Sequence, residues 1–189
     1  MTLRDALAAI TPHLHDEVCV AANGFISRAV SAVRDREDTF YMIGSMGLAA
    51  AIGFGIALAQ PKRRVLVFDG DGNVLMGMGE LASIAAAKPA NLWHLCFDNG
   101  VHASTGGQRT IADRVVLSEL ARAAGYRWVK RSQSAAELGR DVPEFLATVG
   151  PAFLHVCIAP GPPGPPEPRI THTPPELTAR LRHALGTPR

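Results

Sequence analysis

The sequence predicts an α/β fold, a three-layer doubly wound parallel sheet with helices on both faces. Short apolar runs of strand length alternate along the chain with longer segments of helical character. This alternation is typical of parallel sheets with crossover helices and not of β-sandwiches. Glycine-containing turns follow two of the apolar runs, at Asn23-Gly24 and at Gly70-Asp71-Gly72. Such turns end strands and lead into helices, which supports the predicted order of elements.

Helix boundaries are predicted from capping residues, and strands from apolar runs. Thr2 is predicted to cap the first helix, with Asp5 in its first turn, and Gly125 to end a later helix. Pro143 is expected to interrupt a helix. The predicted strands cover residues 18–22, 39–43, 65–68, 92–97, 127–130 and 152–158. The predicted helices cover residues 2–10, 27–34, a small-residue stretch ending near 59, 74–87, 115–124, 134–149 and 174–185.

The chain divides into a predicted binding domain at residues 1–158 and a proline-rich arm at residues 159–189. The arm begins with APGPPGPPEP, which is too rich in proline for a helix or a sheet and favours a polyproline-like conformation. It ends in a short predicted helix. We expect the arm to be a loose end or to pack on a neighbouring molecule.

Size and charge restrict the classes of function. A chain of 189 residues with 47% apolar residues is long enough for one well-packed domain. A formal net charge of +2, with the basic residues scattered, gives no indication of nucleic-acid binding. The three cysteines, Cys19, Cys96 and Cys157, lack a CxxC spacing, which favours reduced thiols.

Targeting signals and membrane spans are not expected. The N-terminal residues carry an acid early and lack an apolar core, so we predict no signal peptide and a cytoplasmic location. The uncharged stretch 39–61 is nominally long enough to span a bilayer. Because it contains several glycines and starts like a strand, we interpret it as strand, turn and buried helix.

Polar residues follow two of the predicted strands. Asp71 comes after the strand at 65–68, and Asn99 after the strand at 92–97. Adjacent parallel strands would bring both residues to the carboxyl edge of the sheet, where open α/β sheets bind ligands. Carboxylate and amide oxygens suit Mg²⁺, which usually takes its remaining ligands from phosphates and water. Gly70 and Gly72 would let phosphate oxygens approach the backbone at a helix N-terminus. The residues therefore predict a magnesium-diphosphate site.

A dinucleotide-binding site is the alternative interpretation of the glycines. Residues 77–82, GMGELA, fit G-x-G-x-x-A, and Asp98 follows at a suitable distance. The preceding strand ends several residues too early, however, and these glycines lie within a helical pattern. We therefore disfavour a phosphoryl-binding Rossmann enzyme.

The same motifs resemble a known family. Gly70-Asp71-Gly72 followed by Asp98-Asn99 resembles the signature of thiamine diphosphate-dependent decarboxylases. GSMG at 44–47 and NGVHASTGGQ at 99–108 are similar to the phosphonopyruvate and sulfopyruvate decarboxylase branch. The resemblance implies the thiamine diphosphate-binding fold, with thiamine diphosphate and Mg²⁺ as cofactors.

The resemblance also implies roles for individual residues. Asp71, Asn99 and the carbonyl of Val101 would bind Mg²⁺, and Gly72 and Asn73 would donate to the diphosphate. The Gly44 carbonyl would accept from the aminopyrimidine, and Met46 would support the bent cofactor, a position that suits a soft thioether. The implied cofactor-binding residues are Gly44, Ser45, Met46, Gly70, Asp71, Gly72, Asn73, Asn99 and Val101.

Candidate substrate residues follow the second metal motif. His102 is the best candidate for substrate or proton handling, and Ser104 and Thr105 could donate to an anionic group from a loop that closes. An ordinary glycine-rich loop explains Ser104 and Thr105 equally well. Arg28 could bind a phosphonate or sulfonate bidentately, although a helical arginine is more often a solvated charge. The other histidines show no metal-ligand spacing and are expected to be structural or exposed.

Enzymes of this family also need a pyrimidine-binding domain with an activating glutamate. Too few residues precede the GSMG motif to form such a domain. The resemblance thus implies the diphosphate-binding subunit of a split carboxy-lyase that acts on sulfopyruvate, phosphonopyruvate or another 3-substituted pyruvate. We expect it to be inactive alone and to function with an α subunit as an α2β2 or larger assembly. A non-catalytic or regulatory subunit, and another thiamine-dependent lyase or carboligase, remain as alternatives.

Overall fold

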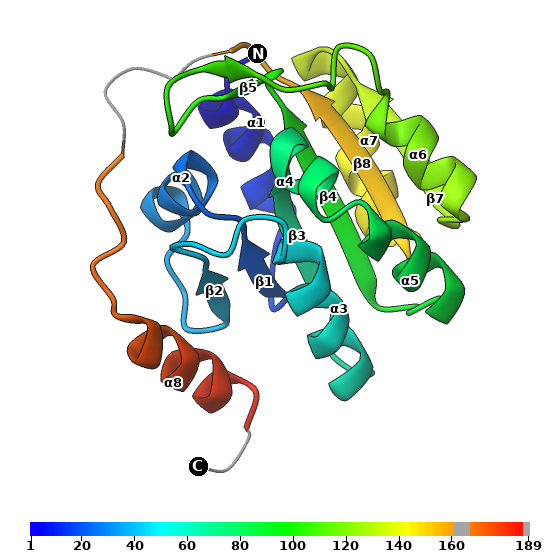
Figure 1. Cartoon of the computed structure of the whole chain (residues 1–189). Helices are drawn as coiled ribbons and strands as arrows, with labels where there is room; N and C mark the ends of the chain where they lie inside the picture. Colours follow the sequence, from blue (N-terminus) through cyan, green and yellow to red (C-terminus); the bar gives the residue numbers. More distant parts are fainter. Residues whose placement is uncertain (161–166, 187–189) are drawn as a thin grey trace.

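The computed structural model describes residues 1–160 and 167–186. Most of the predicted polyproline-like segment lies outside these residues. The described chain contains a parallel sheet with the strand order β2-β1-β3-β4-β8-β7 (Figure 1). These strands are β1 (Val18–Ala21), β2 (Thr39–Tyr41), β3 (Val65–Gly70), β4 (Leu92–Asp98), β7 (Trp128–Ser132) and β8 (Ala152–Cys157). The predicted parallel sheet is therefore confirmed.

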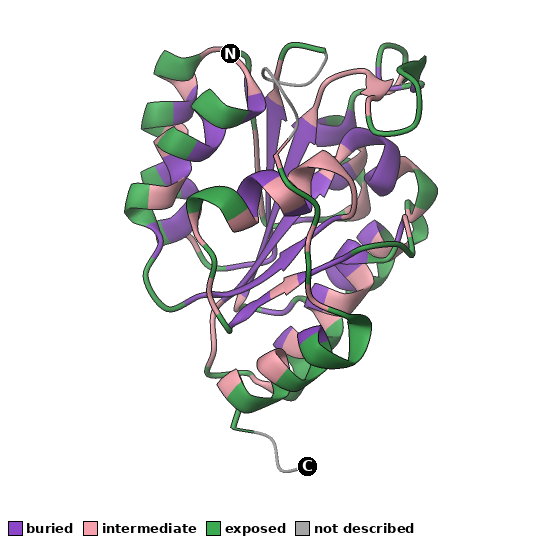
Figure 2. Ribbon diagram, turned by 90° about the vertical axis from the view of Figure 1, so that its left-hand side faces the viewer, coloured by how far each residue is buried: buried purple, intermediate pink, exposed green. Residues whose placement is uncertain are grey.

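Helices cover both faces of this sheet, as predicted. One face packs against helices α1 (Leu3–Ile10), α2 (Phe25–Val33), α7 (Ala135–Ala147) and α8 (Pro174–Ala184). The other packs against α3 (Ala49–Ala59), α4 (Asp71–Met76), α5 (Gly79–Ala87) and α6 (Leu117–Ala124). Figure 2 shows the buried residues concentrated along the strands between the two helical layers. The remaining elements are a 3₁₀ turn, η1 (Thr11–His13), and a small antiparallel ribbon of β5 (Val101–His102) and β6 (Gln108–Arg109).

The predicted caps are present at the N-terminus of α1 and at the C-terminus of α6. Thr2 Oγ1 accepts from the Asp5 N–H at 3.2 Å, and the Thr2 N–H donates to Asp5 Oδ2 at 2.8 Å. This reciprocal capping box satisfies two N–H groups that the first turn would leave free. Helix α6 ends at Gly125 with φ of +107°, a conformation that glycine adopts without strain.

Two helices differ from the prediction. The single helix expected at 74–87 is split into α4 and α5, and α4 already begins at Asp71. At the break, a Cβ atom on Gly77 would lie 2.1 Å from the Gly47 carbonyl oxygen, so the close approach of these two backbones requires glycine. Helix α7 continues through Pro143 without interruption. Burial of its neighbours Val142 and Phe145 outweighs the one hydrogen bond that proline removes.

The C-terminal helix differs from the expectation of a loose end or an arm on a neighbour. Helix α8 packs on its own chain beside β2, with Leu177 buried. At its edge Arg180 pairs with Asp35 at 2.9 Å. The arm thus returns to the domain that precedes it.

The uncharged stretch 39–61 forms β2 and α3, as interpreted from the sequence. Helix α3 is buried along one face only, and Leu58 on its other face is 56% exposed. Within the described ranges, none of the helices has both the length and the apolar character that crossing a membrane requires.

Candidate functional site

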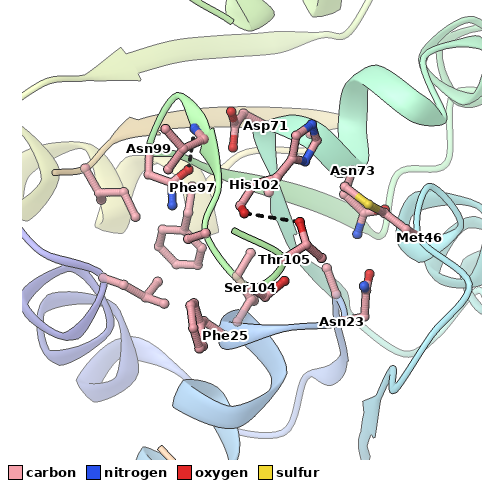
Figure 3. Close-up of a pocket in the computed structure, with 18 residues that line it drawn as sticks. Asn23, Phe25, Met46, Asp71, Asn73, Phe97, Asn99, His102, Ser104 and Thr105 are labelled. Carbon is pink, nitrogen blue, oxygen red and sulfur yellow. Dashed lines mark hydrogen bonds between the residues drawn. The ribbon is translucent and has the colours of Figure 1, made fainter. Parts of the chain in front are cut away.

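A pocket opens at the carboxyl edge of the sheet, where the chain reverses its direction of winding. From β1 the chain passes through α2 to β2, and it then crosses back to β3 on the other side of β1. The loops after β1 and β3 diverge at this point, which is where doubly wound sheets bind ligands. The pocket is lined by Asn23 after β1, by residues 70–73 after β3, and by Asn99 and Val101 after β4 (Figure 3).

Asp71 begins helix α4 and is 3% exposed. Its Oδ2 accepts a hydrogen bond of 2.5 Å from the hydroxyl of Thr110. Burial raises the pKa of the Asp71 carboxyl, the Thr110 hydrogen bond lowers it, and the charge of Asp98 raises it further. A buried carboxylate with these neighbours gains much from a bound cation, because a cation offsets the cost of burying its charge.

Thr110 was not identified from the sequence, although it connects both loops of the predicted metal site. Its hydroxyl donates to Asp71, and its N–H donates to the Gly100 carbonyl at 3.0 Å. It lies directly after β6 and is buried. Proximity in sequence to the NGVHASTGGQ motif was the only signal that could have suggested it.

Asn99 occupies the turn between β4 and β5. Its Oδ1 accepts from the Val101 N–H at 3.0 Å, and the preceding Asp98 Oδ1 accepts from the Gly100 N–H at 3.0 Å. These two side-chain hydrogen bonds fix the turn in one conformation. Asn99 and Val101 line the pocket together with Asp71.

Asn73 presents an unsatisfied donor at the pocket. Its Oδ1 accepts from the Gly47 N–H, whereas its buried Nδ2 has no hydrogen-bond partner among the described residues. A buried amide donor without a partner is costly, and it marks a place for an acceptor that completes the site. A diphosphate oxygen would be such an acceptor.

Gly72, Met46 and His102 converge on one side of the pocket. A Cβ atom on Gly72 would lie 2.5 Å from Cε1 of His102 and 3.1 Å from Cε of Met46. Only glycine leaves room for these two side chains to approach the helix start. Figure 3 shows His102, Met46, Asp71 and Asn73 around the same space. These residues, together with the Asn73 donor and the Asp71 carboxylate, fit a magnesium-diphosphate group.

Three of the predicted residues are not among those that line the pocket. Gly44 and Ser45 lie in the exposed loop before α3, and Ser45 has φ of +56°. Arg28 stacks over the ring of Phe25, with its guanidinium carbon 5.4 Å from the ring centre. Ser104 and Thr105 do line the pocket, in the turn that joins β5 to β6.

Sequence reasoning did not find the apolar wall of the pocket. This wall faces the polar loops and consists of Leu3, Ala22, Phe25, Ile26, Phe97 and Ile158. Among the described residues that line the pocket, none is Lys or Arg. Asp71 is the carboxylate among them, so anionic groups of a ligand would need a metal ion or a cation from another chain.

The buried histidines have specific acidic partners. His94 pairs with Asp69 and His155 with Asp98, consistent with the expectation of structural roles. Asp98, His155 and Cys157 bring potential ligand atoms within 4.8 Å of one another, a grouping that their sequence spacing did not suggest. Asp98 is already occupied by His155 and by the Gly100 N–H. Arg131 Nε donates to Cys157 Sγ at 3.3 Å, so the Asp98 and Cys157 side chains already have partners within the described chain.

Known proteins resemble this chain in sequence and in fold. The family model described as "Thiamine pyrophosphate enzyme, C-terminal TPP binding domain" matches residues 24–156. Phosphonopyruvate decarboxylase of Streptomyces viridochromogenes is 45% identical over 174 residues, which are 92% of this chain and 43% of that protein. Sulfopyruvate decarboxylase subunit beta of Methanothermobacter thermautotrophicus is 41% identical over 157 residues, 83% of this chain and 82% of that subunit.

The structural comparison agrees at the level of the fold. Benzoylformate decarboxylase from Polynucleobacter necessarius superposes with a TM-score of 0.69 at 16% identity, over 84% of this chain and 33% of that enzyme. This chain spans less than half the length of the phosphonopyruvate decarboxylases that it matches. Because the family model covers most of the chain, the chain belongs to the thiamine pyrophosphate enzymes and corresponds to their C-terminal TPP binding domain.

Proposed function

We propose that this chain binds thiamine diphosphate and Mg²⁺ and serves as the diphosphate-binding subunit of a 2-oxo acid decarboxylase. The observation that carries the proposal is the pairing of the buried Asp71 carboxylate with the unsatisfied Asn73 Nδ2 in one pocket. The first suits a hard cation, and the second suits a phosphate oxygen.

The chain's residues would hold and orient the cofactor. Asp71, the Asn99 side chain and the Val101 carbonyl would bind Mg²⁺, and Gly72 and Asn73 would donate to the diphosphate. Met46 would contact the cofactor between its rings, since it already lies beside Gly72. The bound thiazolium supplies the electron sink for loss of CO₂ from a 2-oxo acid. The protein's part is positioning in a pocket with one apolar wall, which limits access of water.

His102 is the chain's own candidate for handling a proton. It is partly buried, lines the pocket and lies beside Gly72, where the diphosphate-binding turn begins. Its backbone carbonyl accepts from the Thr105 and Gly107 N–H groups at 3.2 and 3.0 Å, which fixes the backbone that carries the ring. A neutral imidazole in this position would accept or return a proton during turnover.

We propose a 3-substituted pyruvate, sulfopyruvate or phosphonopyruvate, as the substrate. The names of the relatives support this class. Both compounds carry a second anionic group, and the described pocket residues include no Lys or Arg. The cation for that group would then come from the metal or from a partner chain.

The partner would be an α subunit that carries the pyrimidine-binding domain, in an α2β2 or larger assembly. Relatives of this length are named as beta subunits. The phosphonopyruvate decarboxylases are longer, and this chain matches less than half of each. A split enzyme, in which a partner would supply the pyrimidine-binding domain, is consistent with both facts.

Co-purification followed by a decarboxylation assay tests the proposal. The chain would be expressed with the product of its neighbouring gene and assayed with sulfopyruvate and phosphonopyruvate, with and without thiamine diphosphate and Mg²⁺. We expect CO₂ release only when both chains and both cofactors are present. Cofactor binding without release from either substrate would support a different lyase or carboligase. Absence of binding in the complex would indicate a non-catalytic subunit, and turnover by the chain alone would contradict the need for a partner.

A further inference from the structure

The strand that precedes Asp71 carries a buried aspartate–histidine pair. Asp69 Oδ2 lies 3.0 Å from His94 Nε2, and both side chains are at most 2% exposed. The other oxygen, Asp69 Oδ1, accepts from the Gly70 N–H at 2.9 Å. The second ring nitrogen, His94 Nδ1, lies 3.3 Å from the Tyr126 hydroxyl, so both nitrogens of the imidazole have partners. We name Asp69 and His94 the β3 clamp.

The next strand carries a second pair of the same kind. Asp98 Oδ2 lies 2.8 Å from His155 Nε2, and the side chains are 11% and 1% exposed. Asp98 Oδ1 accepts from the Gly100 N–H at 3.0 Å, and the Asp98 carbonyl accepts from the Ile158 N–H at 2.8 Å. We name Asp98 and His155 the β4 clamp.

The two clamps occupy equivalent places in the strand register. Asp69 is opposite Cys96, and its histidine lies two residues before that cysteine. Asp98 is opposite Cys157, and its histidine again lies two residues before the cysteine. The sequence shows this as a repeated His-x-Cys, HLC at 94–96 and HVC at 155–157. The aspartate is the last but one residue of β3 in the first pair and the last residue of β4 in the second, and in both pairs the histidine lies diagonally across on the neighbouring strand.

We propose that these clamps are positioning devices, and that each holds one of the loops that carry the metal ligands. The proposal rests on the proposed function of the pocket as a magnesium-diphosphate site. In each clamp one carboxylate oxygen accepts from a backbone N–H one or two residues further along the chain, and the other is held by an imidazole fixed in the sheet. A carboxylate bonded on both sides cannot rotate, so the loop keeps one orientation relative to the strands. Partners outside the ligand shell fix ligand orientation in metal sites in this way.

The two clamps differ in the partner of the second imidazole nitrogen, Nδ1. The β3 clamp continues to Tyr126, and the His94 ring also packs edge-on against Phe153, with ring centres 4.9 Å apart. In the β4 clamp, His155 Nδ1 is buried and has no partner among the described residues. Removing His155 therefore disturbs fewer other contacts, and the β4 clamp is the better place for a test.

The test compares His155→Leu, which removes the donor, with His155→Gln, which keeps an amide donor. His183→Leu is the matched control, because it breaks an exposed imidazole–carboxylate pair of 3.0 Å with Glu37, far from the pocket. Hydrogen–deuterium exchange of the ligand-free chain is measured first. Mg²⁺-dependent binding of thiamine diphosphate to the co-purified complex is measured second, by calorimetry at varied Mg²⁺.

We expect His155→Leu to accelerate exchange at residues 98–101 by about tenfold, with exchange at 69–73 unchanged. It should also weaken Mg²⁺ binding by about 10- to 100-fold. His155→Gln should restore most of both properties, and His183→Leu should change neither. The equivalent His94→Gln and His94→Leu variants should move the exchange effect to residues 69–73.

If exchange at residues 98–101 is unchanged in His155→Leu while the complex still binds the cofactor, the positioning role of the clamps is wrong and the proposed function stands. Equal losses in the Leu and Gln variants would also overturn them, because the donor would then not matter. A wild-type complex without Mg²⁺-dependent cofactor binding would overturn the proposed function, and the positioning role with it. The exchange measurement needs no cofactor and so separates these two failures.

Discussion

The loops at residues 70–73 and 98–101 start inside the sheet, whereas residues 104–109 at the same pocket are exposed. Where these loops leave β3 and β4, the carboxylates of Asp69 and Asp98 accept from the Gly70 and Gly100 N–H groups and are themselves held by histidines. In the third segment, Thr105 Oγ1 donates to Gln108 Oε1 at 3.2 Å, and Gly106 and Gly107 have φ of +134° and +74°.

This difference in how firmly the segments are held suits two separate roles at the pocket, cofactor binding and substrate entry. The proposed metal and diphosphate binding requires atoms that stay in place, and loops held to the sheet by side-chain hydrogen bonds provide them. A segment held by a few exposed hydrogen bonds opens at low cost in free energy, which suits the entry of a substrate. Substitutions in the fixed loops should therefore change cofactor affinity, and substitutions in the exposed segment should change turnover.

The largest effect is expected from Asp71→Ala. Removing the buried carboxylate would take away a proposed metal ligand, so the affinity for thiamine diphosphate with Mg²⁺ should fall by more than the ~100-fold typical of an outer-shell loss. Calorimetry on the co-purified complex would measure this. Asp113→Ala is the matched control, since Asp113 is an exposed acid paired with Arg109 at 2.7 Å. Equal affinities for the two variants would contradict the assignment of Asp71.

Gly72→Ala should destabilise the chain and impair binding together. The added Cβ would lie 2.5 Å from the His102 ring. Overpacking of this kind costs about 1–3 kcal/mol of unfolding free energy. Gly139→Ala is the control, because Gly139 lies within helix α7 and a Cβ there meets no atom within 4 Å. It should stabilise the chain by about 0.5–1 kcal/mol. Urea unfolding of both variants gives these values, and destabilisation by both would exclude contact with His102 as the cause.

Thr110→Val should shift the pH dependence of Mg²⁺ binding. The Thr110 hydrogen bond lowers the pKa of Asp71, which burial raises above its ordinary value of 3.8. Without that bond the pKa rises further, so the carboxyl binds its proton at higher pH and competes with Mg²⁺ there. The midpoint of the loss of Mg²⁺ binding on acidification should move upward.

The same shift has a consequence for folding. Because the folded-state pKa of Asp71 is raised, its contribution to stability is greatest at low pH and is lost as the pH rises through that pKa. Thermal melting of the ligand-free wild type and Thr110→Val at several pH values checks this sign. An unchanged binding midpoint in Thr110→Val would show that Thr110 does not act on Asp71.

The smallest effects are expected in the exposed segment. Thr105→Ala removes the hydroxyl that bonds to Gln108, and it should change the unfolding free energy by less than ~0.5 kcal/mol. Cofactor affinity should stay at the wild-type value, while kcat/KM of the complex falls by about 2- to 10-fold. Thr105→Ser keeps the hydroxyl and should restore turnover. A loss of cofactor affinity in Thr105→Ala would remove the distinction between the fixed and the exposed segments.

Several parts of the site could be predicted because they depend on local patterns. Asp71 and Asn99 each follow an apolar strand, and parallel strands end at the same edge. Glycine at 72 and 100 and the Asx-type turn at Asn99 are also readable from short motifs. Thr110 was missed because its contact with Asp71 joins residues 39 positions apart. Gly44 and Ser45 lie outside the pocket lining, in an exposed loop whose later residue Gly47 contacts the backbone of Gly77.

The sequence by itself determined the parallel sheet, the two polar turns at its edge and the family of the chain. These follow from apolar periodicity and turn chemistry, which act between near neighbours. Only the tertiary structure decided where the predicted helix 74–87 breaks, that α8 packs beside β2, and which histidine pairs with which aspartate. Those features depend on strand register and on the close approach of distant backbones, and a shift of one residue would turn His94 and His155 to the opposite face.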